Sequence, residues 1–100
     1  MYLIQQNIEK IISLCRKYKV KNMYVFGSIL TPRFTDESDI DLLVNFSNDL
    51  DYLSYADNIL DLYADLKDIF GRNIDLVDES SVKNPYFKKE LDQTKQLIYG

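Results

Sequence analysis

Apolar and polar residues follow one another along the chain with periods that predict helices and strands in turn. Near the start, apolar residues recur every three or four positions, the spacing of one helix face; they are Leu3, Ile4, Ile8, Ile11, Ile12, Cys15 and Tyr18. This pattern predicts one amphipathic helix that ends near Lys19. Residues 22–26 are aromatic and β-branched and stop at Gly27, which predicts a buried strand and a tight turn capped by Ser28.

The middle of the chain predicts a loop, a central strand and a long helix. Residues 31–38 lack periodicity and contain a proline, so we expect a loop. Residues 40–44 are apolar enough on both sides to form a central strand. Residues 47–49 supply candidate capping side chains for a helix from about 50 to 70, which ends at Gly71.

The remaining segments complete a predicted α/β (α+β) fold. Residues 73–77 predict a third strand, and Asn84 with Pro85 predicts the start of a last helix that carries Phe87, Leu91 and Ile98. Strands separated by helices in this order indicate a small mixed β-sheet of three or so strands flanked by helices. A chain of 100 residues has the size of one small domain, so we assign residues 1–100 to a single domain.

Charge and composition exclude several classes of function. The net charge of −4 argues against direct nucleic-acid binding, which relies on many Lys and Arg contacts to phosphates. The start of the chain lacks the basic and long apolar regions of a signal peptide, and no apolar run approaches the length of a membrane span; we expect a cytoplasmic protein without membrane contact. Cys15, the only cysteine, falls on an apolar helix face and is interpreted as a core residue.

Any bound metal must be held by carboxylates, because the chain has no histidine and one cysteine. Mg²⁺, Mn²⁺ and Ca²⁺ prefer such oxygen ligands. Asp39 and Asp41 flank one residue at the start of the central strand, so they should project from one face about 7 Å apart. Asp75 would join them if its strand pairs alongside, forming a three-carboxylate site for two cations and phosphoryl transfer.

Simpler interpretations remain for these residues. Asp39 and Asp41 could be solvated acids at a strand edge, and Asp78 is an alternative third ligand to Asp75. Gly27 allows the backbone to approach a phosphate closely, and Ser28 adds a hydroxyl and a helical turn with free N–H groups. Alone, the pair would be an ordinary turn; only the acids downstream favour a phosphate role.

Three features stand out together: residues 24–28 (YVFGS), the ten residues between Ser28 and Asp39, and residues 38–44 (SDIDLLV). They resemble the signature of the MNT group in the polymerase-β-like nucleotidyltransferase superfamily. The resemblance spans nearly the whole chain. It implies that Gly27 and Ser28 bind the triphosphate of ATP, that Asp39 and Asp41 bind two Mg²⁺ ions, and that Asp75 binds the catalytic ion and helps to activate the acceptor hydroxyl.

The chain departs from the family pattern after the Gly-Ser turn. Many relatives carry an Arg-Gly pair there, whereas this sequence has Thr31-Pro32-Arg33. Arg33 could reach the phosphates from its shifted position or be a solvated loop residue. The departure puts activity and nucleotide choice in question.

The resemblance implies transfer of AMP from ATP to a protein hydroxyl, the acceptor being a HEPN-type ribonuclease toxin that this chain would neutralise as an antitoxin. The long helix is consistent with a partner, because its apolar residues cover roughly 220° of its circumference, against about 100° for an ordinary surface helix. We expect Tyr55, Leu62 and Ile69 to contact the toxin or a second copy of the chain.

Two other functions stay open at this point. The chain could be a non-catalytic antitoxin that acts by occlusion, or it could transfer a nucleotide to a small molecule such as an aminoglycoside.

Overall fold

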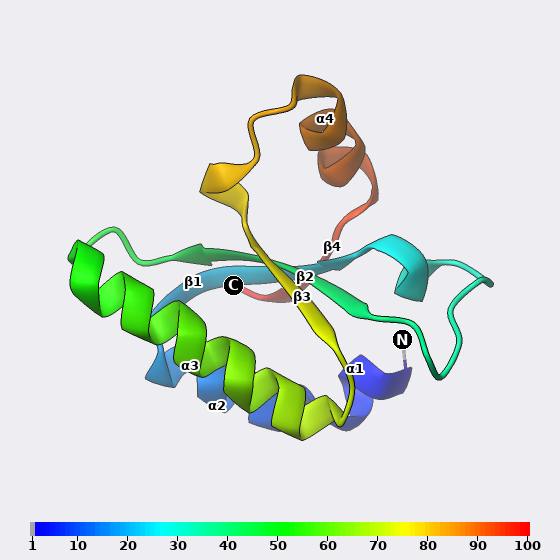
Figure 1. Ribbon diagram of the computed structural model, residues 1–100, viewed down its shortest axis with the longest axis horizontal. Coiled ribbons are helices and arrows are strands. Elements are labelled where there is room, and N and C mark those ends of the chain that lie inside the picture. Colours follow the sequence, from blue (N-terminus) through cyan, green and yellow to red (C-terminus); the bar gives the residue numbers. More distant parts are fainter. Residues whose placement is uncertain (1) are drawn as a thin grey trace.

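The computed structural model describes residues 2–100 as a four-stranded mixed sheet covered unequally on its two faces (Figure 1). The main elements are α1 (Tyr2–Gln6), α2 (Ile8–Lys17), β1 (Val20–Phe26), β2 (Ile40–Phe46), α3 (Tyr52–Phe70), β3 (Ile74–Asp78), α4 (Pro85–Thr94) and β4 (Gln96–Tyr99). Helices α1, α2 and α3 lie below the sheet in this view, and α4 lies above it.

The sheet has the strand order β3-β2-β1-β4. β2 pairs with β3 in parallel and with β1 antiparallel, and β1 also pairs antiparallel with β4. The predicted mixed α/β fold with β2 at its centre is therefore confirmed. The strand β4 was not predicted: Ile98 was assigned to the last helix, but α4 ends at Thr94, and the four residues of β4 are ordered by pairing with β1.

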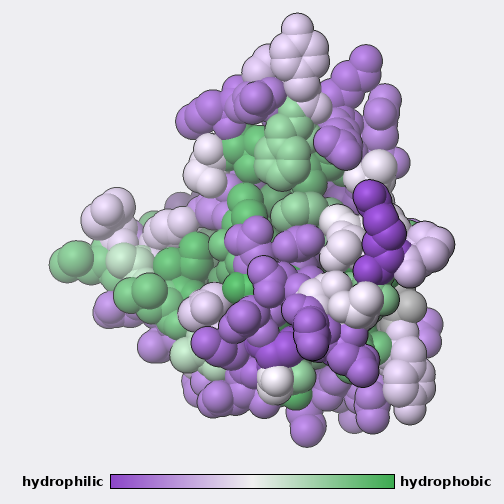
Figure 2. Space-filling model, turned by 45° about the vertical axis from the view of Figure 1, so that its right-hand side comes forward, coloured by the Kyte–Doolittle hydropathy of each residue, from purple (hydrophilic) through white to green (hydrophobic). Residues whose placement is uncertain are grey.

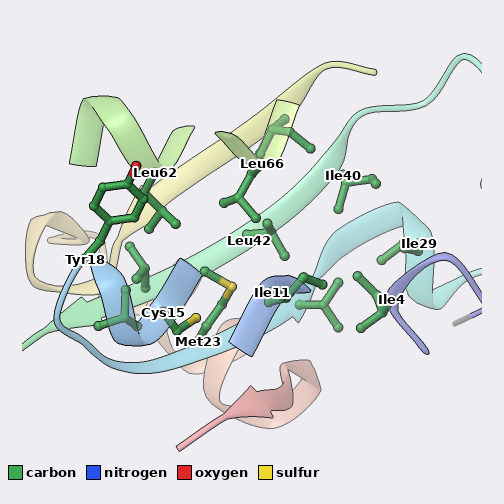
Figure 3. Packing of buried hydrophobic residues seen from close by; sticks show 14 residues of the cluster. Ile4, Ile11, Cys15, Tyr18, Met23, Ile29, Ile40, Leu42, Leu62 and Leu66 are labelled. Carbon is green, nitrogen blue, oxygen red and sulfur yellow. The ribbon is translucent and has the colours of Figure 1, made fainter. Parts of the chain in front are cut away.

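The larger hydrophobic core lies under the sheet, between its lower face and the first three helices (Figure 3). Ile11 and Cys15 of α2 and Leu62 and Leu66 of α3 are fully buried there against residues such as Leu42. Burying side chains of this size contributes about 1.5–3 kcal/mol each. The core interpretation of Cys15 is confirmed, and burial raises the pKa of its thiol to about 12.

The upper face carries a smaller core beneath α4. Phe26, Leu43 and Leu91 are its buried members. Leu43 and Leu42 belong to different cores because successive side chains of a strand point to opposite faces. Each face of β2 is therefore covered along part of its length, which explains the continuous apolar run in its sequence.

Two local predictions were wrong in detail. The first helix is divided at Asn7, whose side-chain amide donates to the Leu3 carbonyl at 2.9 Å and competes with the helical pattern. The cap of α3 is Asp51, which accepts from the Ser54 N–H at 2.7 Å, rather than residues 47–49. The predicted stop at Gly71 is confirmed, with φ +63°.

Among residues 2–100, no helix has both the length and the apolar character that a bilayer crossing requires.

Candidate functional site

The parallel pairing of β2 and β3 places Asp41 directly opposite Asp75. Neighbouring strands lie about 4.8 Å apart, so the two side chains leave the sheet side by side. Ile40 and Leu42 enter the lower core, so Asp41 projects from the upper face. Asp39 immediately precedes β2, at the same end of the sheet. The sheet thus pairs Asp41 with Asp75 and places all three predicted aspartates at one end.

The carboxylates of Asp75 and Asp39 act electrostatically on that of Asp41. Partial burial raises the pKa of Asp41, and the negative charges of Asp75 and Asp39 raise it further, while the facing Ser28 N–H lowers it. Among residues 2–100, however, no three acidic, His or Cys side chains are close enough to form a ready-made metal cluster. Like charges repel one another, and Asp39 and Asp75 are both exposed. The donor set of carboxylate oxygens fits Mg²⁺, whose charge would offset this repulsion.

Gly27 lies against the Asp41 carboxylate and adopts a backbone conformation that other residues rarely take. Its φ is +79°, and a Cβ added there would overlap Asp41 Oδ2 and lie 3.1 Å from Asp41 Cγ. Both the conformation and the close approach therefore require glycine. Gly27 also begins the short 3₁₀ turn Gly27–Leu30, with Phe26 in the cap position. The prediction of Ser28 as the cap is therefore wrong, because the left-handed conformation of Gly27 starts the turn one residue earlier.

A pocket of ≈ 540 Å³ opens between the Gly27 turn and α4. Its lining residues are Phe26, Gly27, Ser28, Leu30, Thr31, Arg33, Phe87, Glu90, Leu91, Thr94 and Gln96. Hydrophobic side chains are visible in the hollow below α4 in Figure 2. Arg33 thus lines the same pocket as Gly27 and Ser28. The α4 side of the pocket was missed, although the apolar pair Phe87 and Leu91, four residues apart, was a signal for it.

Arg72 fixes the loop that leads to Asp39. Its guanidinium donates to the carbonyl oxygens of Thr35 and Ser38 at 3.1 and 3.0 Å and lies 5.0 Å from the centre of the Phe34 ring. Residues 31–38 form no helix or strand, as predicted, so these contacts restrain a segment that lacks sheet pairing. Sequence reasoning missed this role, because only the fold brings residue 72 beside this loop.

Lys95 ties the end of α4 to the upper face of the sheet. Its ammonium lies 2.9 Å from Glu79 Oε2 and 4.3 Å from the centre of the Tyr24 ring. Asn45 Nδ2 donates to the other oxygen of Glu79 at 2.6 Å. Burial works against the charged form of Glu79, but the hydrogen bonds from Asn45 and Lys95 outweigh it and lower the pKa. This network holds α4 over the pocket.

The predicted partner contacts on α3 need correction. Leu62 is fully buried in the lower core, Ile69 is half-buried, and Tyr55 is half-buried with its hydroxyl donating to Asp78. Leu62 is therefore unable to form an accessible partner surface. The error arose because apolar residues surround most of α3, so its sequence did not reveal which part faces the sheet.

Comparison with known proteins supports the architecture. The family model for polymerase beta nucleotidyltransferases matches residues 9–100. Candidate protein adenylyltransferase MJ0128 of Methanocaldococcus jannaschii is 42% identical over 86 residues, which cover 86% of this chain and 82% of the relative.

Two solved structures resemble the chain in fold. One is a crystal structure of a toxin–antitoxin with AMP-PNP. The match covers 94% of this chain and 73% of the chain in that structure, with a TM-score of 0.72 and 27% identity. A structure of the tri-AMPylated Shewanella oneidensis HEPN toxin in complex with MNT antitoxin matches 96% of this chain and 71% of its own, with a TM-score of 0.61 and 26% identity. By its sequence and its fold, the chain belongs to the polymerase beta nucleotidyltransferase family and is a nucleotidyltransferase.

Proposed function

We propose that this protein is a Mg²⁺-dependent adenylyltransferase that transfers AMP from ATP to a hydroxyl group of a HEPN-type toxin, and so acts as its antitoxin. The pairing of Asp41 with Asp75 beside the Gly27 turn is the observation that carries the chemistry. The name of the relative MJ0128 supports a protein acceptor. The structures named above, one with AMP-PNP and one with an AMPylated HEPN toxin, support the nucleotide and the acceptor class.

Asp39, Asp41 and Asp75 would hold two Mg²⁺ ions. When bound, such ions supply positive charge that stabilises the phosphoryl oxygens and the leaving pyrophosphate. Asp75, which is exposed on an edge strand, would accept the proton of the attacking hydroxyl. This exposure suits an acceptor that arrives on the surface of another protein.

Gly27, Ser28 and Arg33 would bind the triphosphate. The Asp41 carboxylate takes the place of a side chain at Gly27, so the turn lies beside a proposed metal ligand, and Arg33 supplies positive charge from the same pocket. Thr31 donates its hydroxyl to the Ser28 carbonyl at 2.8 Å and so fixes the end of the turn. Positioning and charge stabilisation are the main requirements of phosphoryl transfer. We place this reaction in the cytoplasm and assign it to residues 1–100 as one domain.

The direct test incubates the chain with α-³²P-labelled ATP, Mg²⁺ and the purified HEPN-type ribonuclease from the same source. We expect label on the ribonuclease, dependence on Mg²⁺, and a loss of at least about 100-fold in rate for Asp39→Asn with Asp41→Asn. Glu37→Gln, a neighbouring exposed acid outside the proposed site, is the matched control and should transfer at the wild-type rate.

The altered segment Thr31-Pro32-Arg33 favours one second candidate, a non-catalytic antitoxin that works by occlusion. In that case the chain would neutralise the ribonuclease without labelling it, and the double aspartate variant would neutralise it equally well. This result would establish occlusion and contradict the enzyme. Label on an aminoglycoside in place of the ribonuclease would contradict the protein acceptor.

A further inference from the structure

Helix α3 has four faces: one toward the core, one toward α2, an apolar one and an acidic one. At 100° per residue, Leu62 and Leu66 point into the core, whereas Asn58 and Asp65 point about 60–80° to one side of it. These latter two contact α2: Asn58 Nδ2 donates to the Tyr18 carbonyl at 3.0 Å, and the Tyr18 hydroxyl donates to Asp65. The opposite flank of α3 therefore faces away from α2.

That free flank carries a stripe of apolar side chains, here called the α3 stripe, of which all but the half-buried Ala56 are exposed. It spans about 120° of the helix and consists of Tyr52, Leu53, Ala56, Leu60, Tyr63 and Ala64. The exposed fractions of Tyr52, Leu53 and Leu60 are 82%, 75% and 67%. The stripe is about 18 Å long, which matches three turns of a partner helix. Figure 2 shows hydrophobic side chains reaching the surface at the left edge, where α3 begins.

The polar surroundings of the α3 stripe indicate the charge of its occupant. Asp57, Asp61 and Asp68 form an exposed acidic row along the border of the stripe that faces solvent, while Lys67 lies on the line of the stripe just beyond its end. An antiparallel α3–α3 pair of two copies would place both acidic rows on the same side, where they repel. A partner with Lys or Arg along one border of an apolar ridge complements both features.

The stripe also continues into a polar pocket. A pocket of ≈ 700 Å³ at the start of α3 is lined in part by Tyr52, Asp51, Asp78 and Asn45. A pocket beside an apolar ridge can receive an anchoring side chain of a docked protein. The lining carries two carboxylates, those of Asp51 and Asp78, against the single ammonium group of Lys21, so its net charge favours the same basic occupant.

The position of the stripe relative to the catalytic residues also bears on its role. α3 packs below the sheet and precedes β3, the edge strand that carries Asp75 on the upper face. The flank turned away from α2 lies on the β3 side, because α2 packs under β1 and α3 contacts β3. A protein bound there would adjoin the edge of the sheet from which Asp75 projects, and leave the pocket under α4 open to nucleotide.

We propose that the α3 stripe docks the acceptor protein through an amphipathic helix bordered by Lys or Arg, and holds it beside the edge of β3. This inference rests on the proposed function for the identity of that protein. Docking supplies affinity for the acceptor, and the aspartates on the other face perform the transfer, so the two activities are separable by substitution.

The test measures equilibrium binding of the purified HEPN-type ribonuclease to the chain. Leu53→Lys with Leu60→Lys should weaken binding at least about 30-fold, because two apolar anchors are lost. The variant should bind AMP-PNP with Mg²⁺ as the wild type does. In the transfer assay, its KM for the ribonuclease should rise while the rate at saturation stays unchanged. Asp57→Asn with Asp61→Asn should weaken binding about 3- to 10-fold at low salt and have little effect at 0.5 M salt.

The matched control is Tyr86→Lys with Leu97→Lys. These residues are 85% and 55% exposed on α4 and β4, away from the stripe, and their replacement should leave ribonuclease binding unchanged. Equal binding by the stripe variant and the wild type would overturn the docking site, even if transfer occurs. Binding without transfer in the wild type would contradict the proposed reaction and leave the docking site standing. If the chain alone forms a dimer that the stripe variant does not form, the stripe belongs to an interface with a second copy instead. If the wild type does not bind the ribonuclease, both proposals are overturned.

Discussion

Replacing Gly27 with alanine tests the packing at the centre of the proposed site. A non-glycine residue in the left-handed region costs about 1–2 kcal/mol, and φ at Gly27 is +79°. The new methyl group would also overlap Asp41 Oδ2. The Asp41 backbone is unable to retreat, because β2 is paired with strands on both sides, so the carboxylate has to rotate. Forced rearrangements of this kind cost about 1–3 kcal/mol.

The expected loss is thus about 2–5 kcal/mol in the free energy of unfolding, a large share of the 5–15 kcal/mol typical of such domains. Urea unfolding followed by circular dichroism measures it. Gly71→Ala is the matched control: its φ is similar, +63°, but an added Cβ would meet open space among the described residues. It should cost only the backbone penalty, about 1–2 kcal/mol.

A double-mutant cycle isolates the contact itself. In an Asp41→Ala background the carboxylate is gone, so Gly27→Ala should cost at least about 1 kcal/mol less than in the wild type. Equal losses for the two glycine variants, or a cycle without coupling, would refute the close approach of Gly27 to Asp41. Binding of AMP-PNP with Mg²⁺, measured by calorimetry, should fall for Gly27→Ala and stay at the wild-type level for Gly71→Ala.

Four further changes have defined outcomes. Asp75→Asn relieves repulsion with Asp41 and should raise the free energy of unfolding by about 0.5–1 kcal/mol in EDTA; a loss of stability in the same urea titration would contradict that electrostatic interpretation. Lys95→Met removes a partner of Glu79, so stability at pH 7 should fall by about 1–2 kcal/mol. The folded-state pKa of Glu79 is lowered, so ionised Glu79 stabilises the fold at pH values above its ordinary pKa, and this contribution is lost as the pH falls through the lowered pKa. The stability of the variant should therefore decline less on acidification than that of the wild type. Parallel pH profiles of stability would argue against the network. The Cys15 thiol, with its pKa near 12, should react with Ellman's reagent at pH 8 only after addition of urea, and rapid native labelling would show that it is accessible. Arg72→Ala should weaken AMP-PNP binding about 5- to 10-fold through the loosened loop before Asp39, with partial recovery in Arg72→Lys; unchanged affinity would restrict Arg72 to a stabilising role.

The sequence alone determined the features that depend on neighbouring residues. The long helix and its stop at Gly71 followed from periodicity and from the conformational freedom of glycine. The central position of β2 followed from its continuous apolar run, because a strand covered on both faces needs apolar side chains on both sides. Strand alternation also placed Ile74 and Leu76 toward the lower core, and hence Asp75 toward the upper face.

Only the tertiary structure decided what depends on contacts between distant segments. A four-residue strand such as β4 has too little local pattern to be recognised, and it exists because β1 provides its hydrogen-bonding partner. The sequence of α3 was apolar around most of its circumference, so the sheet and α2 selected Leu62 for the core and left Leu53 and Leu60 exposed. Arg72 reaches the loop before Asp39 because the start of β3 pairs beside the start of β2. Local propensity specifies elements over a few residues, whereas burial and side-chain contacts are properties of the assembled layers.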